Sequence, residues 1–136
     1  MVSWNNLDTL SSYKELADVK PACLTEVMSG DNGAERVKNY SIPMAAGLSY
    51  NYASKQVDEN VLAALEKLAD EAQLADKFKA LYNGEVVNTG EKRLVLHHMT
   101  RGQLGDAVEA DGVDKRTFYK TQQERIAEFA NKVHNG

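Results

Sequence analysis

The strongest helical pattern in this chain is DENVLAALEKLADEAQ, which occupies residues 58–73. Asp58 is suited to the N-cap, where its carboxylate would accept hydrogen bonds from free amide groups, and Glu59 would lie in the positive first turn. The stretch therefore predicts an amphipathic helix that packs by one face and indicates a mainly α fold. Its apolar side chains recur at i, i+4, i+7 and i+11, which aligns them along that face: Val61, Leu65, Leu68 and Ala72.

Further helices are expected downstream of this stretch. One spans residues 74–82, and Gly84 is placed to end it in the left-handed conformation. The next is predicted after an N-cap at Thr89; it carries three adjacent apolar residues, 94–96, and ends at the Gly102-Gln-Leu-Gly105 stretch. The last runs from Asp114 to about Val133 with a regular apolar face: Phe118, Gln122, Ile126, Phe129 and Val133.

Upstream, apolar residues at helical spacing predict two more helices in the first forty residues. The first covers about residues 7–17. The second has Pro21 in its first turn, where a missing amide proton is tolerated, and Gly30 at its end.

One or two short β-hairpins are expected between the helices. Apolar and polar residues alternate over Tyr40–Tyr52 on both sides of residues 45–47, which is typical of two strands and a turn. Pro43 cannot donate a ladder hydrogen bond, so its strand should lie at an edge. Asp111-Gly112, within residues 107–113, is a good two-residue turn for a second hairpin.

Composition excludes several classes of protein. The 136 residues carry 16 Lys and Arg against 20 Asp and Glu, a net charge of −4, so a phosphate-binding nucleic-acid protein is not expected. The apolar runs are too short to cross a membrane, and the first residues lack the features of a secretory signal. A single cysteine excludes an internal disulfide framework and a cysteine-rich zinc site. We therefore expect one helical region over residues 1–136, in the cytoplasm.

The histidines do not predict a metal site. His97 and His98 are adjacent, and neighbouring side chains diverge by about 100° on a helix, whereas helical metal ligands stand four residues apart. One ring is expected to pack and the other to form a hydrogen bond. His134 is expected near a helix C-terminus, where the dipole favours positive charge. Cys23 has no visible base partner and is expected to be a small buried residue.

The remaining charged and glycine-rich features also have structural explanations. The carboxylates of Asp70-Glu71 and of Glu124 and Glu128 are expected on solvated helix faces. Arg93 and Arg101, eight residues apart, would share a helix face and pair with carboxylates of a neighbouring helix. The Gly102–Gly105 stretch lacks the lysine and preceding strand of a phosphate loop. No catalytic, cofactor-binding or metal-binding residue is therefore assigned.

Four segments in order resemble the N-terminal part of glucose-6-phosphate isomerases. They are YNYASK (residues 50–55), FKALYNGE (78–85), VNTGEKRLVLH (87–97) and HMTR (98–101), and a hairpin over Ala107–Val113 and a long final helix follow as in that family. Asn51, Gln56 and the interrupted Thr89-Gly90-Glu91 depart from the family pattern. These departures affect capping and turns rather than any reacting group.

The resemblance implies an enzyme that interconverts aldose and ketose sugar phosphates through an enediol, without metal or organic cofactor. It implies a much longer polypeptide with α/β sheet domains, which this chain lacks. The phosphate loop, the Glu base, the ring-opening His and Lys and the stabilising Arg of the family would lie beyond Gly136. His97 and Arg93 match family positions used for helix packing. The chain is then a helical scaffold whose partners are the rest of the polypeptide and a second subunit of a homodimer.

A second hypothesis belongs to another class of protein. Under this hypothesis the amphipathic helices bury a core among themselves, and the chain is a self-contained helical module for binding other proteins. A self-contained module should leave few apolar faces exposed, whereas a part of a larger enzyme should leave several.

Overall fold

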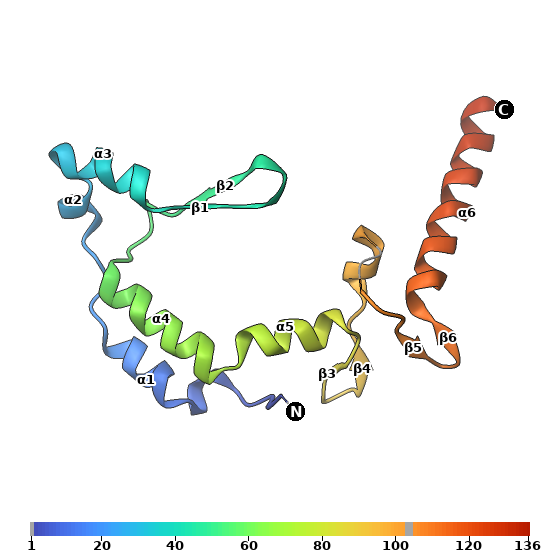
Figure 1. Cartoon of the computed structure of the whole chain (residues 1–136), viewed down its shortest axis with the longest axis horizontal. Coiled ribbons are helices and arrows are strands. Elements are labelled where there is room, and N and C mark those ends of the chain that lie inside the picture. Colours follow the sequence, from blue (N-terminus) through green and yellow to red (C-terminus); the bar gives the residue numbers. More distant parts are fainter. Residues whose placement is uncertain (1, 103–104) are drawn as a thin grey trace. The chain divides into compact units, whose positions relative to one another are not determined.

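The computed structural model describes residues 2–102 and 105–136, and it is mainly α-helical as predicted. The described residues form two compact units (Figure 1). We call Asn5–Ala72 the N-terminal unit and Gln73–Gly136, together with residues 2–4, the C-terminal unit. Of the predicted Gly102–Gly105 stretch, Gln103 and Leu104 lie outside the described residues.

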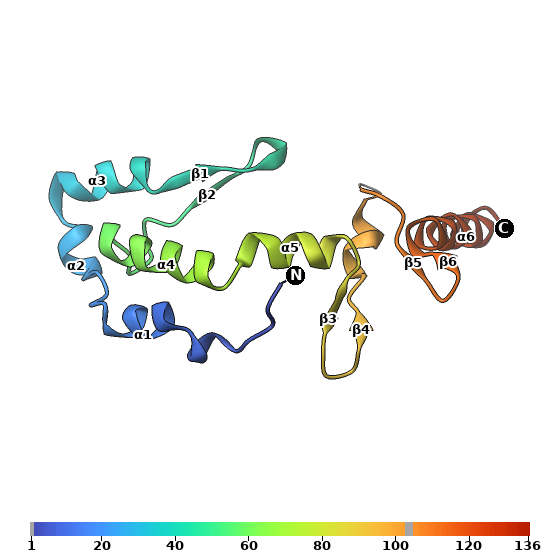
Figure 2. The same cartoon turned by 60° about the horizontal axis from the view of Figure 1, so that its bottom comes forward.

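The N-terminal unit contains four α-helices and one β-ribbon. Helix α1 runs alongside α4, and the ribbon follows α3 (Figures 1 and 2). In chain order the elements are the 3-10 helix η1 (Leu7–Thr9), α1 (Ser11–Asp18), α2 (Leu24–Val27), α3 (Gly30–Asn39), β1 (Ser41–Pro43), the 3-10 helix η2 (Ala45–Gly47), β2 (Ser49–Asn51) and α4 (Glu59–Glu71).

Helix α4 confirms the prediction made from residues 58–73. Asp58 is its N-cap, and the carboxylate oxygen Oδ1 accepts hydrogen bonds of 3.0 Å from the amides of Asn60 and Val61. The predicted face is partly buried, because Val61 and Ala72 are buried while Leu65 remains exposed. The apolar residues buried in this unit are small, mostly alanine: Ala22, Ala53, Val61, Ala64 and Ala72.

Two predicted boundaries near the second helix are wrong. Gly30, expected at a helix end, begins α3 with a positive φ of 59°. Pro21 precedes α2 and does not lie in its first turn, because α2 begins at Leu24. Helix α3 itself was not predicted, because its sequence is mostly polar and only Ala34 and Val37 are apolar residues other than glycine.

The Tyr40–Tyr52 hairpin is confirmed. Strands β1 and β2 are antiparallel, with Ile42 opposite Tyr50 and Pro43 opposite Ser49. In a two-stranded ribbon both strands are edges, so Pro43 is tolerated. The ribbon is held to α3 through Asn51, whose amide Nδ2 donates a 2.6 Å hydrogen bond to the Val37 carbonyl.

The described part of the C-terminal unit contains two α-helices and two β-ribbons. Residues 2–4 join it, since the Ser3 amide donates to the Gln73 side chain at 2.9 Å and the Lys77 ammonium lies 5.6 Å from the Trp4 ring centre. In chain order the elements are α5 (Leu74–Tyr82), β3 (Val86–Asn88), β4 (Arg93–Leu94), the 3-10 helix η3 (His97–Arg101), β5 (Glu109–Ala110), β6 (Val113–Asp114) and α6 (Lys115–Asn135).

Three predictions in this unit are confirmed: the terminator of α5, the Asp111-Gly112 turn and the start of the last helix at Asp114. Gly84 follows α5 with a φ of 74°, as a left-handed terminator requires. Asp111 and Gly112 have φ values of 54° and 71°, the two positive values of a type I′ turn, between β5 and β6. Asp114 caps the long helix α6, where it accepts from the Arg116 and Thr117 amides.

The predicted helix between Thr89 and Gly102 is wrong. The structure has the β3–β4 ribbon there, which raises the number of hairpins to three in residues 2–102 and 105–136, followed only by η3. The Asn88 side chain closes the turn by accepting a 3.1 Å hydrogen bond from the Glu91 amide. The apolar run at residues 94–96 suits an extended chain equally well, and Leu96 is buried while Leu94 packs against the same cluster.

The core of the C-terminal unit is a cluster around Met99, which is completely buried. Leu96 and Val108 are its other buried members, and Leu94 and Tyr119 pack against it. The cluster thereby joins β4, η3 and α6. Among the helices of the described residues, none combines the length and apolar character needed to span a bilayer.

Candidate functional site

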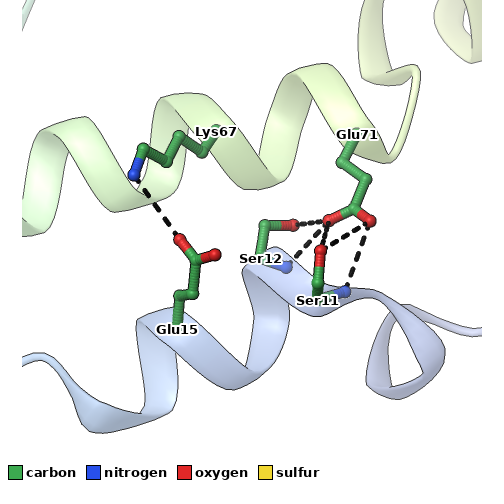
Figure 3. A network of polar contacts seen from close by, with 5 residues as sticks. All are labelled: Ser11, Ser12, Glu15, Lys67 and Glu71. Carbon is green, nitrogen blue, oxygen red and sulfur yellow. Dashed lines mark hydrogen bonds and ion pairs between the residues drawn. The ribbon is translucent and has the colours of Figure 1, made fainter.

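The densest polar cluster joins helices α1 and α4 through Glu71 (Figure 3). Leu10 occupies the N-cap of α1 and offers no side-chain acceptor. The Glu71 carboxylate takes this place: its Oε2 accepts from the Ser12 amide at 2.8 Å, and its Oε1 accepts from the Ser11 amide at 3.3 Å. Both serine hydroxyls also donate to it. A residue sixty positions away thus caps α1.

These hydrogen bonds favour the charged form of the Glu71 side chain. The hydroxyl and amide of Ser12 contribute most, and Ser11 adds to them, lowering the pKa of Glu71 from 4.5 to about 2. A carboxylate at a helix N-terminus also meets the positive end of the helix dipole. Glu71 is exposed, as predicted for a solvated helix face, but its role as the cap of α1 was not predicted. Beside it, the exposed pair Lys67–Glu15, at 3.5 Å, connects the same two helices.

We expect Glu71→Gln to lower the melting temperature of the N-terminal unit above pH 4.5. A pKa that is lower in the folded than in the unfolded state contributes stability above the unfolded value, and that stability is lost as pH falls from about 4.5 to about 2. The difference between variant and parent should therefore shrink across this range, measured by circular dichroism. Asp70→Asn is the control, because the Asp70 carboxylate is next to Glu71 in the sequence but is not part of this cap. An equal effect of both substitutions would contradict the capping role.

Asp114 supports α6 in the same manner. The Thr117 hydroxyl donates to its carboxylate at 2.6 Å, and this bond, with amide donors from Arg116, Val108 and Thr117, holds the pKa of Asp114 below its usual range. These interactions fix where α6 begins. They stabilise structure, and neither carboxylate faces a second acid or base in a manner suited to proton transfer.

The histidines have structural roles, in part as predicted. His98 is both packed and hydrogen-bonded: its ring stacks on Tyr82 at 5.0 Å, and its Nε2 lies 3.1 Å from the Tyr82 carbonyl oxygen. His97 is exposed within its own unit, and its expected role in helix packing stays a prediction. His134 lies in the last turn of α6, as expected. His97, His98 and Arg101, with Thr100, line one hollow, but η3 alone supplies them, so it lacks the opposing wall of a small-molecule site.

The other candidate residues are also placed at structural positions. Arg93 lies in β4 and Arg101 in η3, so they do not share a helix face, and Arg93 pairs at 3.7 Å with Glu91 of its own ribbon. The Arg93 side chain is exposed within its own unit, and the packing role that the resemblance implied stays a prediction. Cys23 is exposed, so the expectation of a small buried residue is wrong.

The carboxylates of α6 are on solvated faces, as predicted. Glu124 lies 3.9 Å from Lys120, and Glu128 lies 2.7 Å from Lys132. In residues 2–102 and 105–136 no three His, Cys, Asp or Glu side chains gather where they could share a metal ion.

Two buried arginines were missed at the level of sequence. Arg36 of α3 donates from Nε to the Ala53 carbonyl at 2.8 Å and from Nη2 to the carbonyls of Lys55 and Val57 at 3.0 and 2.6 Å. Its guanidinium also lies 3.9 Å from the Tyr40 ring centre. Nothing in a polar helical sequence marks such a residue, because its partners are backbone carbonyls.

Arg116 has the equivalent place in the C-terminal unit. Its Nε donates to the Asp106 carbonyl, and its Nη2 donates at 2.9 Å to the Tyr82 carbonyl that His98 also contacts. This carbonyl lies at the C-terminus of α5, where positive charge is favourable. Both arginines therefore organise backbone.

Exposed apolar surface is the remaining feature of interest. In the N-terminal unit, the ribbon and α4 enclose an open hollow of about 260 Å³, lined by Ile42, Tyr50, Tyr52, Lys55, Val57, Leu62 and Leu65. In the C-terminal unit, the predicted apolar face of α6 is uncovered: Phe118, Ile126, Phe129 and Val133 are exposed by 46, 67, 70 and 64%. Such surfaces mark contact with another protein surface.

Comparison with known proteins agrees with this picture. Residues 51–136 match the family model of phosphoglucose isomerase. Glucose-6-phosphate isomerases from Treponema denticola, Borreliella afzelii and Treponema pallidum are 42, 41 and 42% identical over 99, 100 and 99% of this chain. The aligned part is 27, 25 and 26% of those relatives, so the chain spans about a quarter of their length.

Proposed function

Because this chain belongs to the phosphoglucose isomerase family, we propose that residues 1–136 are the helical N-terminal region of a glucose-6-phosphate isomerase. The observation that carries the proposal is the 42% identity with the Treponema denticola enzyme over 99% of this chain. In this region the two units support the catalytic part of the enzyme without supplying reacting groups.

The intact enzyme would interconvert glucose 6-phosphate and fructose 6-phosphate through an enediol intermediate. Moving a proton between C1 and C2 requires a carboxylate base placed within hydrogen-bond reach of the sugar carbon. Preorganised cations would stabilise the oxyanion that develops. We assign these groups to the part of the polypeptide beyond this chain, with no metal or organic cofactor. The enzyme would be cytoplasmic and homodimeric.

Two features of the structure support a scaffold rather than an independent binding module. The charged groups that the described residues bury, Arg36 and Arg116, donate to backbone carbonyls, although Nη1 of Arg116 has no hydrogen-bond partner among those residues. The apolar faces of the β1–β2 ribbon and of α6 are exposed, which is typical of a piece whose partner surface is elsewhere.

The proposal predicts that the purified chain does not isomerise glucose 6-phosphate above the rate of a blank. A chimera that joins this chain to the part of the Treponema denticola enzyme outside the aligned segment should regain activity within about tenfold of that enzyme, since the two sequences are 42% identical over this segment. A coupled assay for fructose 6-phosphate measures both. Turnover by the chain alone, or a folded but inactive chimera, would contradict the proposal.

A further inference from the structure

The exposed apolar face of α6 forms a continuous stripe, made of Phe118, Gln122, Ile126, Phe129 and Val133. At about 100° per residue these five positions fall within about 80° of one another, so they share one side of the helix. Over fifteen residues the stripe is about 22 Å long. Its four apolar members are between 46 and 70% exposed, which is far from the burial such residues reach in a core.

The stripe is not the face by which α6 packs within its own unit. Tyr119 joins the Met99 cluster, and the Gln123 amide donates a 2.6 Å hydrogen bond to the Thr100 carbonyl of η3. Tyr119 and Gln123 point about 60–100° away from the middle of the stripe. The contacts that hold α6 in the C-terminal unit therefore leave Ile126, Phe129 and Val133 exposed, while Phe118 lines a hollow with Leu94 and Leu96 of the same unit.

The C-terminal half of α6 lacks the contacts that stabilise a helix. From Glu124 to Asn135 every residue except Ala130 is exposed. Twelve residues form an isolated helix only marginally in water, and the ion pairs Lys120–Glu124 and Glu128–Lys132 add only tenths of a kilocalorie each. This half needs a tertiary partner to be a stable helix.

The charges of α6 indicate what kind of surface the partner offers. Both ion pairs are internal to the helix and lie on its other faces, so none of the five stripe residues is charged. Arg125 lies next to the stripe along α6, and its Nη1 donates a 3.4 Å hydrogen bond to the Gln122 side chain. An apolar surface fits such a stripe, because an unpaired charge placed beneath Ile126 or Phe129 would lose its hydration. Gln122, within the stripe, would form a hydrogen bond with one polar group of the partner surface.

We propose that the α6 stripe is the surface by which this region docks onto an apolar groove of the remaining polypeptide of the same enzyme. This inference rests on the proposed function, and it adds the surface and its partner. The relatives continue for about three quarters of their length outside the aligned segment, which supplies a candidate surface. Covalent linkage gives that surface a millimolar or higher effective concentration, which a second copy does not reach.

Hydrogen exchange in the chimera tests this docking independently of activity. Amides of residues 124–135 should exchange at least tenfold more slowly in the chimera than in the 136-residue chain. Phe129→Asp should abolish this protection, whereas Asn131→Asp, which adds the same charge about 200° around the helix, should leave it. A photo-crosslinking amino acid at position 129 should form crosslinks within one polypeptide.

The outcomes separate this inference from the proposed function. An active chimera whose α6 amides exchange as fast as in the chain alone, or whose protection survives Phe129→Asp, would overturn the docking and leave the function standing. Crosslinks between two copies would also overturn it, since the occupant would then be a second subunit. A protected α6 in an inactive chimera would support the docking and contradict the function.

Discussion

Arg36→Ala is expected to lower the free energy of unfolding of the N-terminal unit by about 3 kcal/mol. The substitution removes three hydrogen bonds from a cationic donor to the carbonyls of Ala53, Lys55 and Val57, and it removes the contact with the Tyr40 ring. The segment that holds these carbonyls links the ribbon to α4 and has no regular secondary structure of its own. It should therefore lose its position relative to α3.

Urea unfolding followed by hydrogen exchange at α3 and α4 measures this loss. Arg36→Lys is the informative second variant, because lysine keeps the charge but cannot reach three carbonyls with a planar fork. It should recover less than half of the loss. Lys38→Ala is the matched control on the same helix, since Lys38 forms only an exposed pair with Glu35, and it should change stability by less than about 0.5 kcal/mol. Equal losses of stability in Arg36→Ala and Lys38→Ala would show that the buried Arg36 guanidinium does not stabilise the N-terminal unit through its hydrogen bonds.

Met99→Ala is expected to lower the stability of the C-terminal unit by about 3 kcal/mol. The Met99 side chain is completely buried at the centre of the cluster that joins β4, η3 and α6. Truncation loses the transfer free energy of the removed atoms and leaves a cavity that its neighbours fill only in part. Because domains are stable by only 5–15 kcal/mol, this loss should be visible as a lower urea midpoint for exchange at α5 and α6.

Met99→Leu distinguishes the destabilisation caused by the cavity from that caused by the loss of the sulfur atom. Leucine has similar volume, so it should cost less than about 1.5 kcal/mol. Met44→Ala, at a site that is 56% exposed, should be nearly neutral. A Met99→Ala protein as stable as the Met44→Ala protein would contradict the assignment of this cluster as the core of the unit.

Local sequence predicted those parts of the fold that are stabilised locally. Helix α4 and its cap at Asp58, the end of α5 before Gly84, the turn at Asp111-Gly112 and the start of α6 at Asp114 are all confirmed. In each case the residue and the backbone groups that it stabilises lie within a few positions of one another. The family resemblance drawn from residues 50–101 likewise rested on ordered local motifs, and it is confirmed.

The errors occur where distant contacts decide local structure. The apolar run at residues 94–96 is compatible with helix and strand, and its extended form follows from packing around Met99. Helix α3 has only two apolar residues other than glycine to reveal it, and Arg36 anchors it to carbonyls about twenty residues away. Glu71 caps α1 only because α1 and α4 lie side by side, and the spacing of residues within one helix cannot predict which helices pair.

The sequence by itself determined the mainly helical class, the boundaries of α4, α5 and α6, and the family, because hydrophobic period, caps and left-handed glycines act over a few residues. The tertiary structure decided which side chains are buried, that two arginines organise backbone, and that the α6 stripe is uncovered within its own unit. These depend on which segments meet in space, and the free energy of such contacts is a property of the pair rather than of either segment.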